Sequence, residues 1–224
     1  MKAPKALKID KTLTTHGDTR HDPYFWMNNR ENPEVIKYLN EENDYADAVM
    51  KDTEPLQEEL YEEMKARYKK DDESIPYFFN EYWYIVRYEE GKEYPIFCRR
   101  FQTMENAEEI ILDVNILAGD HDFFEVASVA TSPDNRLVSF SEDSVGRRIY
   151  TLKFKNLQTG EYLGDEIKNT TGKAVWANDN EHVFYIRKDK SLRAYKVYRH
   201  KIGTDSSEDV LVFHEKDDTF DVNV

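Results

Sequence analysis

Apolar residues in the first third of the chain recur at the spacing of helices. Asn32 followed by Pro33 predicts a helix start, with a capping side chain and proline at the first helical position. The apolar positions that follow come at steps of three and four residues, which marks one helix face. A second helix is predicted from Thr53-Glu54-Pro55 onward, and we expect both faces to pack against other parts of a protein. The two stripes are Ile36, Leu39, Asn43, Ala46 and Met50, then Leu56, Leu60, Met64 and Tyr68.

The pattern changes from helices to strands near residue 74. Aromatic and β-branched runs follow, separated by polar turns. The predicted strands cover residues 81–87, 94–99 and 110–114, with a turn at 90–92. Because helices come first and only strands follow, the alternation of a doubly wound α/β domain is absent. We therefore expect a helical lead-in over residues 1–74 and a β domain over residues 75–224.

The β domain contains an internal repeat. Moving Asp134–Thr159 forward by 45 positions places it on Asp179–Thr204 without a gap. Each copy has a polar turn, an apolar strand, a basic turn and an alternating strand. The identical pairs are Asp134/Asp179, Asn135/Asn180, Val138/Val183, Arg148/Arg193, Tyr150/Tyr195 and Thr159/Thr204. A period of about 40–50 residues with several strands per copy is typical of propeller blades, and a β-sandwich is the structural alternative.

The rest of the β domain carries weaker signs of the same unit. Residues 82–114 resemble an earlier, less regular copy, and Thr219–Val224 echoes Phe123–Ser128, as if another blade began there. A propeller hides its strand edges by closing, typically with about 4–8 blades. Two or three copies cannot close, so we expect these residues to be the first blades of a larger propeller.

Composition and charge exclude several classes of function. The net charge of −14 opposes binding to nucleic acid or to anionic membrane surfaces. The first ten residues lack the apolar core of a signal peptide, and no apolar run approaches the length of a membrane span. Cys98 is the single cysteine and lies in an apolar run, which predicts a core residue and a reducing, cytoplasmic setting.

No residue is assigned as catalytic, cofactor-binding or metal-binding. A serine nucleophile elbow needs Gly-x-Ser-x-Gly, but the only glycines four apart are Gly160 and Gly164, with Tyr162 between them. Dinucleotide, phosphate-loop and HExxH motifs are also absent. One cluster has ligand-like residue types, and it consists of His16, Asp18, His21 and Asp22. Its spacing fits no zinc pattern, so local hydrogen bonds that fix an extended lead-in, with Tyr24, Phe25 and Trp26 packed on a partner domain, are the favoured interpretation.

The remaining polar candidates are interpreted as structural. We expect packing or polar-face roles for the dispersed histidines His121, His182, His200 and His214. The basic segments Arg147-Arg148 and Lys188–Arg193 are predicted hairpin turns, with contact to another domain or to substrate as the alternative. Asp71-Asp72-Glu73 is predicted to be a solvated hinge, with attraction of a cationic peptide as the alternative.

The chain resembles the oligopeptidase B (protease II) family of the prolyl oligopeptidase superfamily. The resemblance begins in the segment His16–Met27 and continues in order along essentially the whole sequence. Its further motifs are Asn32–Val35, Tyr38-Leu39, Glu41–Tyr45, Leu60–Met64, Asp71–Tyr77, Tyr88–Pro95, Cys98–Arg100, Leu112–Asn115, Ser132–Leu137, Val145–Arg148, Val175–Asn180, Tyr198–His200 and Glu215–Phe220.

The resemblance implies a fold and a function. The fold is mainly β with an N-terminal helical segment: the first blades of a seven-bladed propeller, without the α/β-hydrolase domain. The implied enzyme is a cytoplasmic serine peptidase that cleaves short peptides after Arg or Lys. The propeller limits access, and the early helices pack on the C-terminal hydrolase domain, which carries the catalytic triad. The alternative is a stand-alone propeller-type module that binds another protein.

Overall fold

The computed structural model describes residues 2–224 and divides the chain into two compact parts. The N-terminal part ends at Lys69, and the strand part begins at Lys70. Each part is described by itself below. Within residues 2–224, no helix is both long and apolar enough to cross a membrane.

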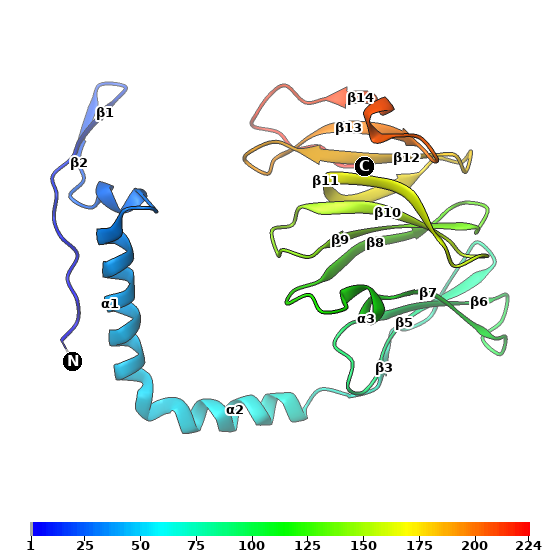
Figure 1. The fold of residues 1–224 in the computed structure, drawn as a ribbon, viewed down its shortest axis with the longest axis horizontal. Helices are drawn as coiled ribbons and strands as arrows, with labels where there is room; N and C mark the ends of the chain where they lie inside the picture. Colours follow the sequence, from blue (N-terminus) through cyan, green and yellow to red (C-terminus); the bar gives the residue numbers. More distant parts are fainter. Residues whose placement is uncertain (1) are drawn as a thin grey trace. The chain divides into compact units, whose positions relative to one another are not determined.

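The N-terminal part is a small hairpin followed by helices (Figure 1). Its elements are β1 (Thr12–Thr15), β2 (Asp18–His21), the 3₁₀ turn η1 (Phe25–Asn28), α1 (Pro33–Met50), the 3₁₀ turn η2 (Lys51–Thr53) and α2 (Glu54–Ala66). The side chain of Asn32 accepts a hydrogen bond from the backbone N–H of Glu34 at 3.0 Å, and Pro33 is the first residue of α1. Both predicted helix starts are therefore confirmed.

The predicted apolar faces of the helices are exposed within this part. Ile36 and Leu39 of α1 retain about half of their surface, and so do Leu56 and Leu60 of α2. The one buried residue of α1 is Val35, which is not in the predicted stripe. The spacing identified the helices, but the residues of these stripes are exposed within the N-terminal part.

The strand part contains two antiparallel sheets (Figure 1). The first sheet comprises β3 (Asp72–Glu73), β4 (Tyr77–Phe79), β5 (Tyr82–Tyr88), β6 (Ile96–Phe101) and β7 (Glu108–Asp113). The second comprises β8 (Glu125–Thr131), β9 (Leu137–Asp143), β10 (Tyr150–Asn156), β11 (Tyr162–Trp176), β12 (His182–Lys188), β13 (Ala194–Lys201) and β14 (Val210–His214). Its strands follow one another in chain order, from β8 at one edge to β14 at the other.

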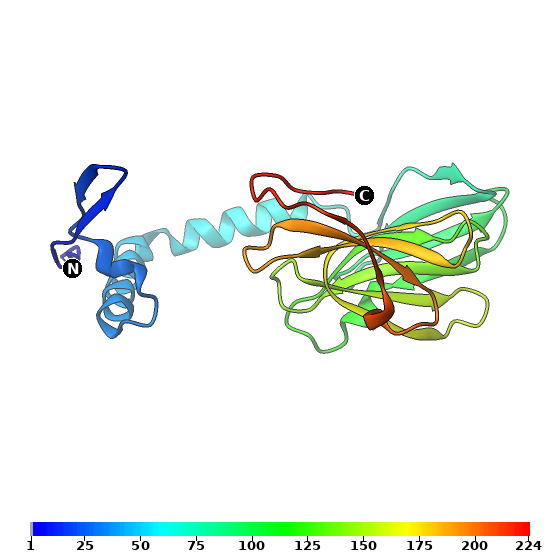
Figure 2. The ribbon, with the colours of Figure 1, turned by 90° about the horizontal axis from the view of Figure 1, so that it is seen from above.

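Two short elements refine the predictions. The strand expected over residues 110–114 ends at Asp113, whose side chain accepts from the N–H of Asn115 and starts α3 (Val114–Ala118). The 3₁₀ turn η3 (Ser206–Glu208) precedes β14. Thr219–Val224 does not form the strand that its likeness to an earlier segment suggested. Instead the final segment runs back beside the start of β13, where the N–H of Val222 donates to Ala194 O (Figure 2).

Strand β11 belongs to two repeats at once. Its first part pairs with β10, and its last part pairs with β12; Thr170 lies opposite Tyr150 on one side and Arg187 on the other. The second sheet is therefore two four-stranded repeats that share β11. We call the first sheet repeat 1, β8 to β11 repeat 2, and β11 to β14 repeat 3.

Three asparagines connect the repeats at equivalent turns. Asn80, Asn135 and Asn180 all have positive φ, at 46°, 62° and 63°. The amide of Asn80 donates to Pro133 O at 2.7 Å, and the amide of Asn135 donates back to Asn80 O at 3.1 Å. The side chain of Asn180 then accepts from the N–H of Asp134 at 2.8 Å. Asparagine tolerates the left-handed region and offers both a donor and an acceptor, so one residue type makes the turn and the connection.

The hydrophobic core lies between consecutive repeats. One cluster fills the space between repeats 1 and 2, and another fills the space between repeats 2 and 3. The first contains Tyr84, Ile111, Leu112, Val114, Ala118, Phe124, Val138 and Phe140. The second contains Leu152, Phe154, Ile167, Ala174, Val183 and Tyr185. Each repeat thus buries its face only by stacking on its neighbour, as expected for a repeat architecture.

Candidate functional site

A buried cluster of titratable groups surrounds His200 in repeat 3. The imidazole is fully buried, with Nδ1 2.6 Å from Asp209 Oδ1 and Nε2 3.4 Å from Asp165 Oδ2. The Tyr185 hydroxyl donates to the other oxygen of Asp209 at 2.7 Å. Burial and this carboxylate raise the pKa of Tyr185 well above its ordinary value, because both disfavour the phenolate.

Three segments position this cluster. His200 lies near the end of β13, Asp165 lies on β11, and Asp209 lies between η3 and β14. The ring of His200 stacks on Phe154 at 5.9 Å between centroids, which places the imidazole against the second core cluster. Asp165 also accepts from the N–H of Gly203 at 2.6 Å and so holds the turn after β13.

The cluster has the partners of a general base but no group to act upon. A catalytic imidazole must reach a nucleophile or a substrate proton. Among the residues that the structure describes, the imidazole contacts Asp165, Asp209 and Phe154, none of which is a hydroxyl or thiol nucleophile. The ring is also sealed from solvent. The arrangement connects three segments of repeat 3.

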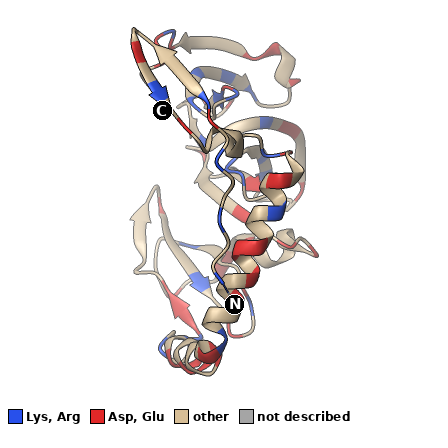
Figure 3. Cartoon of the chain, turned by 90° about the vertical axis from the view of Figure 1, so that its left-hand side faces the viewer, with Lys and Arg blue, Asp and Glu red and all other residues tan. Residues whose placement is uncertain are grey.

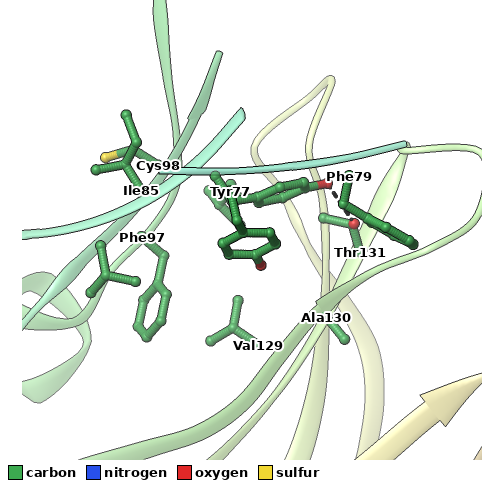
Figure 4. A pocket seen from close by; sticks show the side chains of 11 residues that line it. Tyr77, Phe79, Ile85, Phe97, Cys98, Val129, Ala130 and Thr131 are labelled. Atoms are coloured by element: carbon green, nitrogen blue, oxygen red, sulfur yellow. Dashed lines mark hydrogen bonds between the residues drawn. The ribbon is translucent and has the colours of Figure 1, made fainter. Parts of the chain in front are cut away.

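An apolar pocket of about 240 Å³ lies between repeats 1 and 2. Tyr77 and Phe79 come from β4, while Val129, Ala130 and Thr131 come from β8 (Figure 4). The Tyr84 hydroxyl and Thr131 Oγ1 are 2.9 Å apart and join the two sheets at this pocket. None of its lining residues is charged. The pocket can hold an apolar group but offers no acid–base chemistry.

Cys98 also lines this pocket but is not an activated nucleophile. It is 1% exposed, as the sequence predicted, and burial raises the pKa of its thiol to about 11. The reactive form of cysteine is the thiolate. At neutral pH Cys98 therefore remains a thiol and packs as a small apolar residue.

The His16–Asp22 cluster forms a hairpin rather than a gathered site. His16 and Gly17 make the turn between β1 and β2 at φ of 54° and 81°. The His21 ring lies 3.3 Å from the Thr12 hydroxyl, and Asp22 accepts from the N–H of Tyr24 at 2.9 Å. Within residues 2–224, no three His, Cys, Asp or Glu side chains come together as metal ligands do.

The other predicted candidates lie apart from one another. His182 begins β12 and lies 2.8 Å from Asp179, and His121 contacts Ala118 O. His214 packs its ring edge against Tyr195. Asp72 and Glu73 are paired with β5 as β3, so the predicted hinge is partly a strand. Arg147-Arg148 and Lys188–Arg193 lie at hairpin turns, as expected.

Sequence reasoning missed the groups that matter in repeat 3. His200 is one of several dispersed histidines in the sequence, and its partners lie 35 residues before it (Asp165) and 9 residues after it (Asp209), with no spacing that marks them as partners. Sequence reasoning also passed over Arg187, a cation at the end of an apolar strand. The turn asparagine Asn80 was missed because the first repeat aligns poorly with the others.

Comparison with known proteins identifies the family. A family model described as "Prolyl oligopeptidase, N-terminal beta-propeller domain" matches residues 4–224. A dipeptidyl aminopeptidase BI from Pseudoxanthomonas mexicana is 42% identical over 92% of this chain and 31% of its own length. Protease 2 from Moraxella lacunata is 35% identical over 98% of this chain and 33% of its own length. The chain thus spans about a third of the length of these relatives.

Solved structures agree with this match. Oligopeptidase B from Leishmania major has a TM-score of 0.84 and 36% identity, over 96% of this chain and 33% of that one. Oligopeptidase B from Trypanosoma brucei with covalently bound antipain, in a closed form, has a TM-score of 0.82 and 32% identity with the same coverage. The predicted fold class is confirmed, and the chain belongs to the prolyl oligopeptidase family of peptidases, matching its N-terminal β-propeller domain.

Proposed function

We propose that this chain is the access-controlling propeller portion of a serine oligopeptidase that cleaves short peptides after Arg or Lys. The observation that carries the proposal is the match of residues 4–224 to the family's propeller domain, together with the likeness to oligopeptidase B structures. In this proposal the first blades, residues 75–224, restrict entry of bulky substrates, and the protein acts in the cytoplasm. The net charge of −14 favours cationic peptides.

The catalytic triad is proposed to lie on an α/β-hydrolase domain of the same protein. Residues 1–74 are proposed to pack on that domain. The apolar side chains of α1 and α2 that are exposed within the N-terminal part, such as Leu39 and Leu60, support this role. The sequence of this chain also has no Gly-x-Ser-x-Gly segment.

The assay compares this chain with the full gene product on a short fluorogenic peptide ending in Arg or Lys. We expect turnover by the full product, none by the 224-residue chain, and poor cleavage of the same site inside a folded protein. Labelling of the 224-residue chain by a serine-directed probe would overturn the proposal that the catalytic serine lies on a separate hydrolase domain. Equal turnover of short peptides and folded protein by the full product would overturn the access-controlling role.

A second mode of cleavage is favoured by one observation. The 42% identical relative is named a dipeptidyl aminopeptidase, which indicates release of dipeptides from a free amino end. Mass spectrometry of products from a peptide with a free or an acetylated amino end distinguishes the two modes. Internal cleavage after Arg or Lys from both peptides supports the first mode, and dipeptides from the free peptide alone support the second.

A further inference from the structure

A polar cleft of about 450 Å³ lies between repeats 2 and 3. Ile149 and Asn169 come from repeat 2, and Arg187, Tyr195 and Tyr198 come from repeat 3. The turn between β12 and β13 completes it. Both walls of the cleft therefore belong to the strand part, and Tyr198 also packs against the second core cluster.

Arg187 is the central cation of this cleft. Its guanidinium lies 5.8 Å from the ring centre of Tyr185 and 5.2 Å from that of Tyr198. Its Nε is buried without a hydrogen-bond acceptor, as is one guanidinium nitrogen of Arg99 and one of Arg100. No carboxylate among residues 2–224 forms an ion pair with it. A partly buried guanidinium without a carboxylate partner favours an anionic acceptor in the cleft.

The other arginines of the strand part that are not exposed have carboxylate partners; they are Arg87, Arg99, Arg100 and Arg193. Arg99 makes a two-pronged contact with Glu109, and Arg87 pairs with Glu89 and Glu108. In a chain with a net charge of −14, a carboxylate for each partly buried guanidinium is easily supplied. Figure 3 shows Asp and Glu spread along the helices and sheets. Arg187 departs from this pattern.

The remaining charges of the cleft keep it cationic. Lys188 Nζ donates to Arg148 O at 2.5 Å and joins the two walls. Lys190 is exposed at the turn. Asp189 is the one acidic residue in the lining, and its oxygens already accept from Ser191 and Arg193. Those bonds hold the pKa of Asp189 low, at about 2, and orient it into its own turn.

We propose that this cleft binds the oxyanion group of a small molecule, a carboxylate or a phosphate. Arg187 supplies the planar donor fork that fits such a group, and Lys190 supplies a second positive charge. The tyrosines wall the site and exclude water on one side, which strengthens the charge-assisted hydrogen bonds.

The test is calorimetric titration of the 224-residue chain with sodium phosphate and, separately, sodium citrate, each against sodium chloride of equal ionic strength. We expect saturable binding of at least one anion below ~10 mM, a range that corresponds to about 3 kcal/mol or more. Tighter binding of phosphate assigns a phosphate ligand, and tighter binding of citrate assigns a carboxylate ligand. Absence of saturable heat with both anions would overturn the proposal.

Variants separate the cleft from general charge effects. Arg187→Gln should weaken binding about tenfold or more, Arg187→Lys less than that, and exposed Lys190→Gln about two- to fivefold. Lys201→Gln removes the same charge at the other end of β13 and should leave binding unchanged. Circular dichroism checks the fold of each variant. If Lys201→Gln weakens binding as much as Lys190→Gln, the anion responds to net charge and the proposed site is wrong.

Discussion

At the scale of single residues, Gly172 marks the point where β11 passes from one repeat to the next. Its φ is +90°, and a Cβ placed on it would lie 2.7 Å from Cδ2 of the Tyr150 ring. Tyr150 is itself buried, and its hydroxyl donates a hydrogen bond to the carboxylate of Glu125 at 3.0 Å. The crossing therefore needs a residue without a side chain, for reasons of both conformation and space.

Replacing Gly172 by alanine should lower the free energy of unfolding by about 2–4 kcal/mol, because left-handed strain and the Tyr150 clash add. Gly160→Ala is the matched control, since Gly160 has φ +77° but nothing within 4 Å of the added Cβ. That control should cost about 1 kcal/mol. Urea unfolding monitored by tryptophan fluorescence measures both, and equal losses would show that Tyr150 does not restrict the position.

Two aspartates in turns make the free energy of unfolding depend on pH in the acid range. Backbone hydrogen bonds from Glu181 and His182 and the His182 side chain lower the pKa of Asp179 to about 2, while Ser191 and Arg193 lower that of Asp189 to about 2. The ordinary value is 3.8. A carboxylate with a lowered pKa stabilises the fold above its ordinary pKa, and this stabilisation disappears as pH falls through the folded value.

The melting temperature should therefore fall between about pH 4 and pH 2. Asp179→Asn and Asp189→Asn should each reduce that fall, because the neutral amide cannot titrate. Asp218→Asn removes an exposed carboxylate and is the matched control for the loss of one negative charge. Scanning calorimetry across this pH range measures the slopes, and parallel curves for all four proteins would contradict the assignment.

At the scale of elements, the His200 cluster fastens β14 and η3 to the body of repeat 3. His200 of β13 and Tyr185 of β12 both make side-chain contacts with Asp209. Asp165 of β11 accepts a hydrogen bond from the turn after β13. Val210, Leu211 and Val212 of β14 are each about half exposed. The position of the outer strand thus depends on buried polar contacts as well as on apolar burial.

His200→Phe should preserve the stack on Phe154 and lose both carboxylate contacts. We expect a loss of about 3–5 kcal/mol in the free energy of unfolding, because two buried carboxylates then lack their shared partner. Adding Asp209→Asn to this variant should restore part of the loss by removing one uncompensated charge. Denaturant titration measures the free energy of unfolding of both variants. If His200→Phe alone is as stable as the parent chain, the cluster makes no net contribution to stability.

At the scale of the whole molecule, the strand part has unpaired edges at β14 and at the first sheet. Exposed apolar edge strands pair with other chains unless charge or cover prevents it. Leu211→Lys should reduce concentration-dependent association of the 224-residue chain, measured by analytical ultracentrifugation. Ser207→Lys in nearby η3 adds the same charge away from the edge and should have little effect. Equal association of both variants would place the contact elsewhere.

Sequence reasoning predicted those features whose signals are local. The helix start at Asn32, the helix-to-strand change and the 45-residue repeat all follow from spacing and turn chemistry, and all are present. The sharing of β11 could not be predicted, because an alternating strand does not show where its partner changes. Burial of His200 and the cleft at Arg187 depend on residues that only folding brings together.

The turn asparagines also bear on how such repeats can vary in length. Asn80 and Asn135 are separated by 55 residues, whereas Asn135 and Asn180 follow the 45-residue period. Both intervals bring the asparagine to a left-handed turn at the same level of the stack. We therefore expect insertions and deletions to be tolerated at the hairpins on the opposite end, because the asparagine turns keep the repeats aligned. Variation in loop length, and with it any new binding loops, should then concentrate at one end of the propeller.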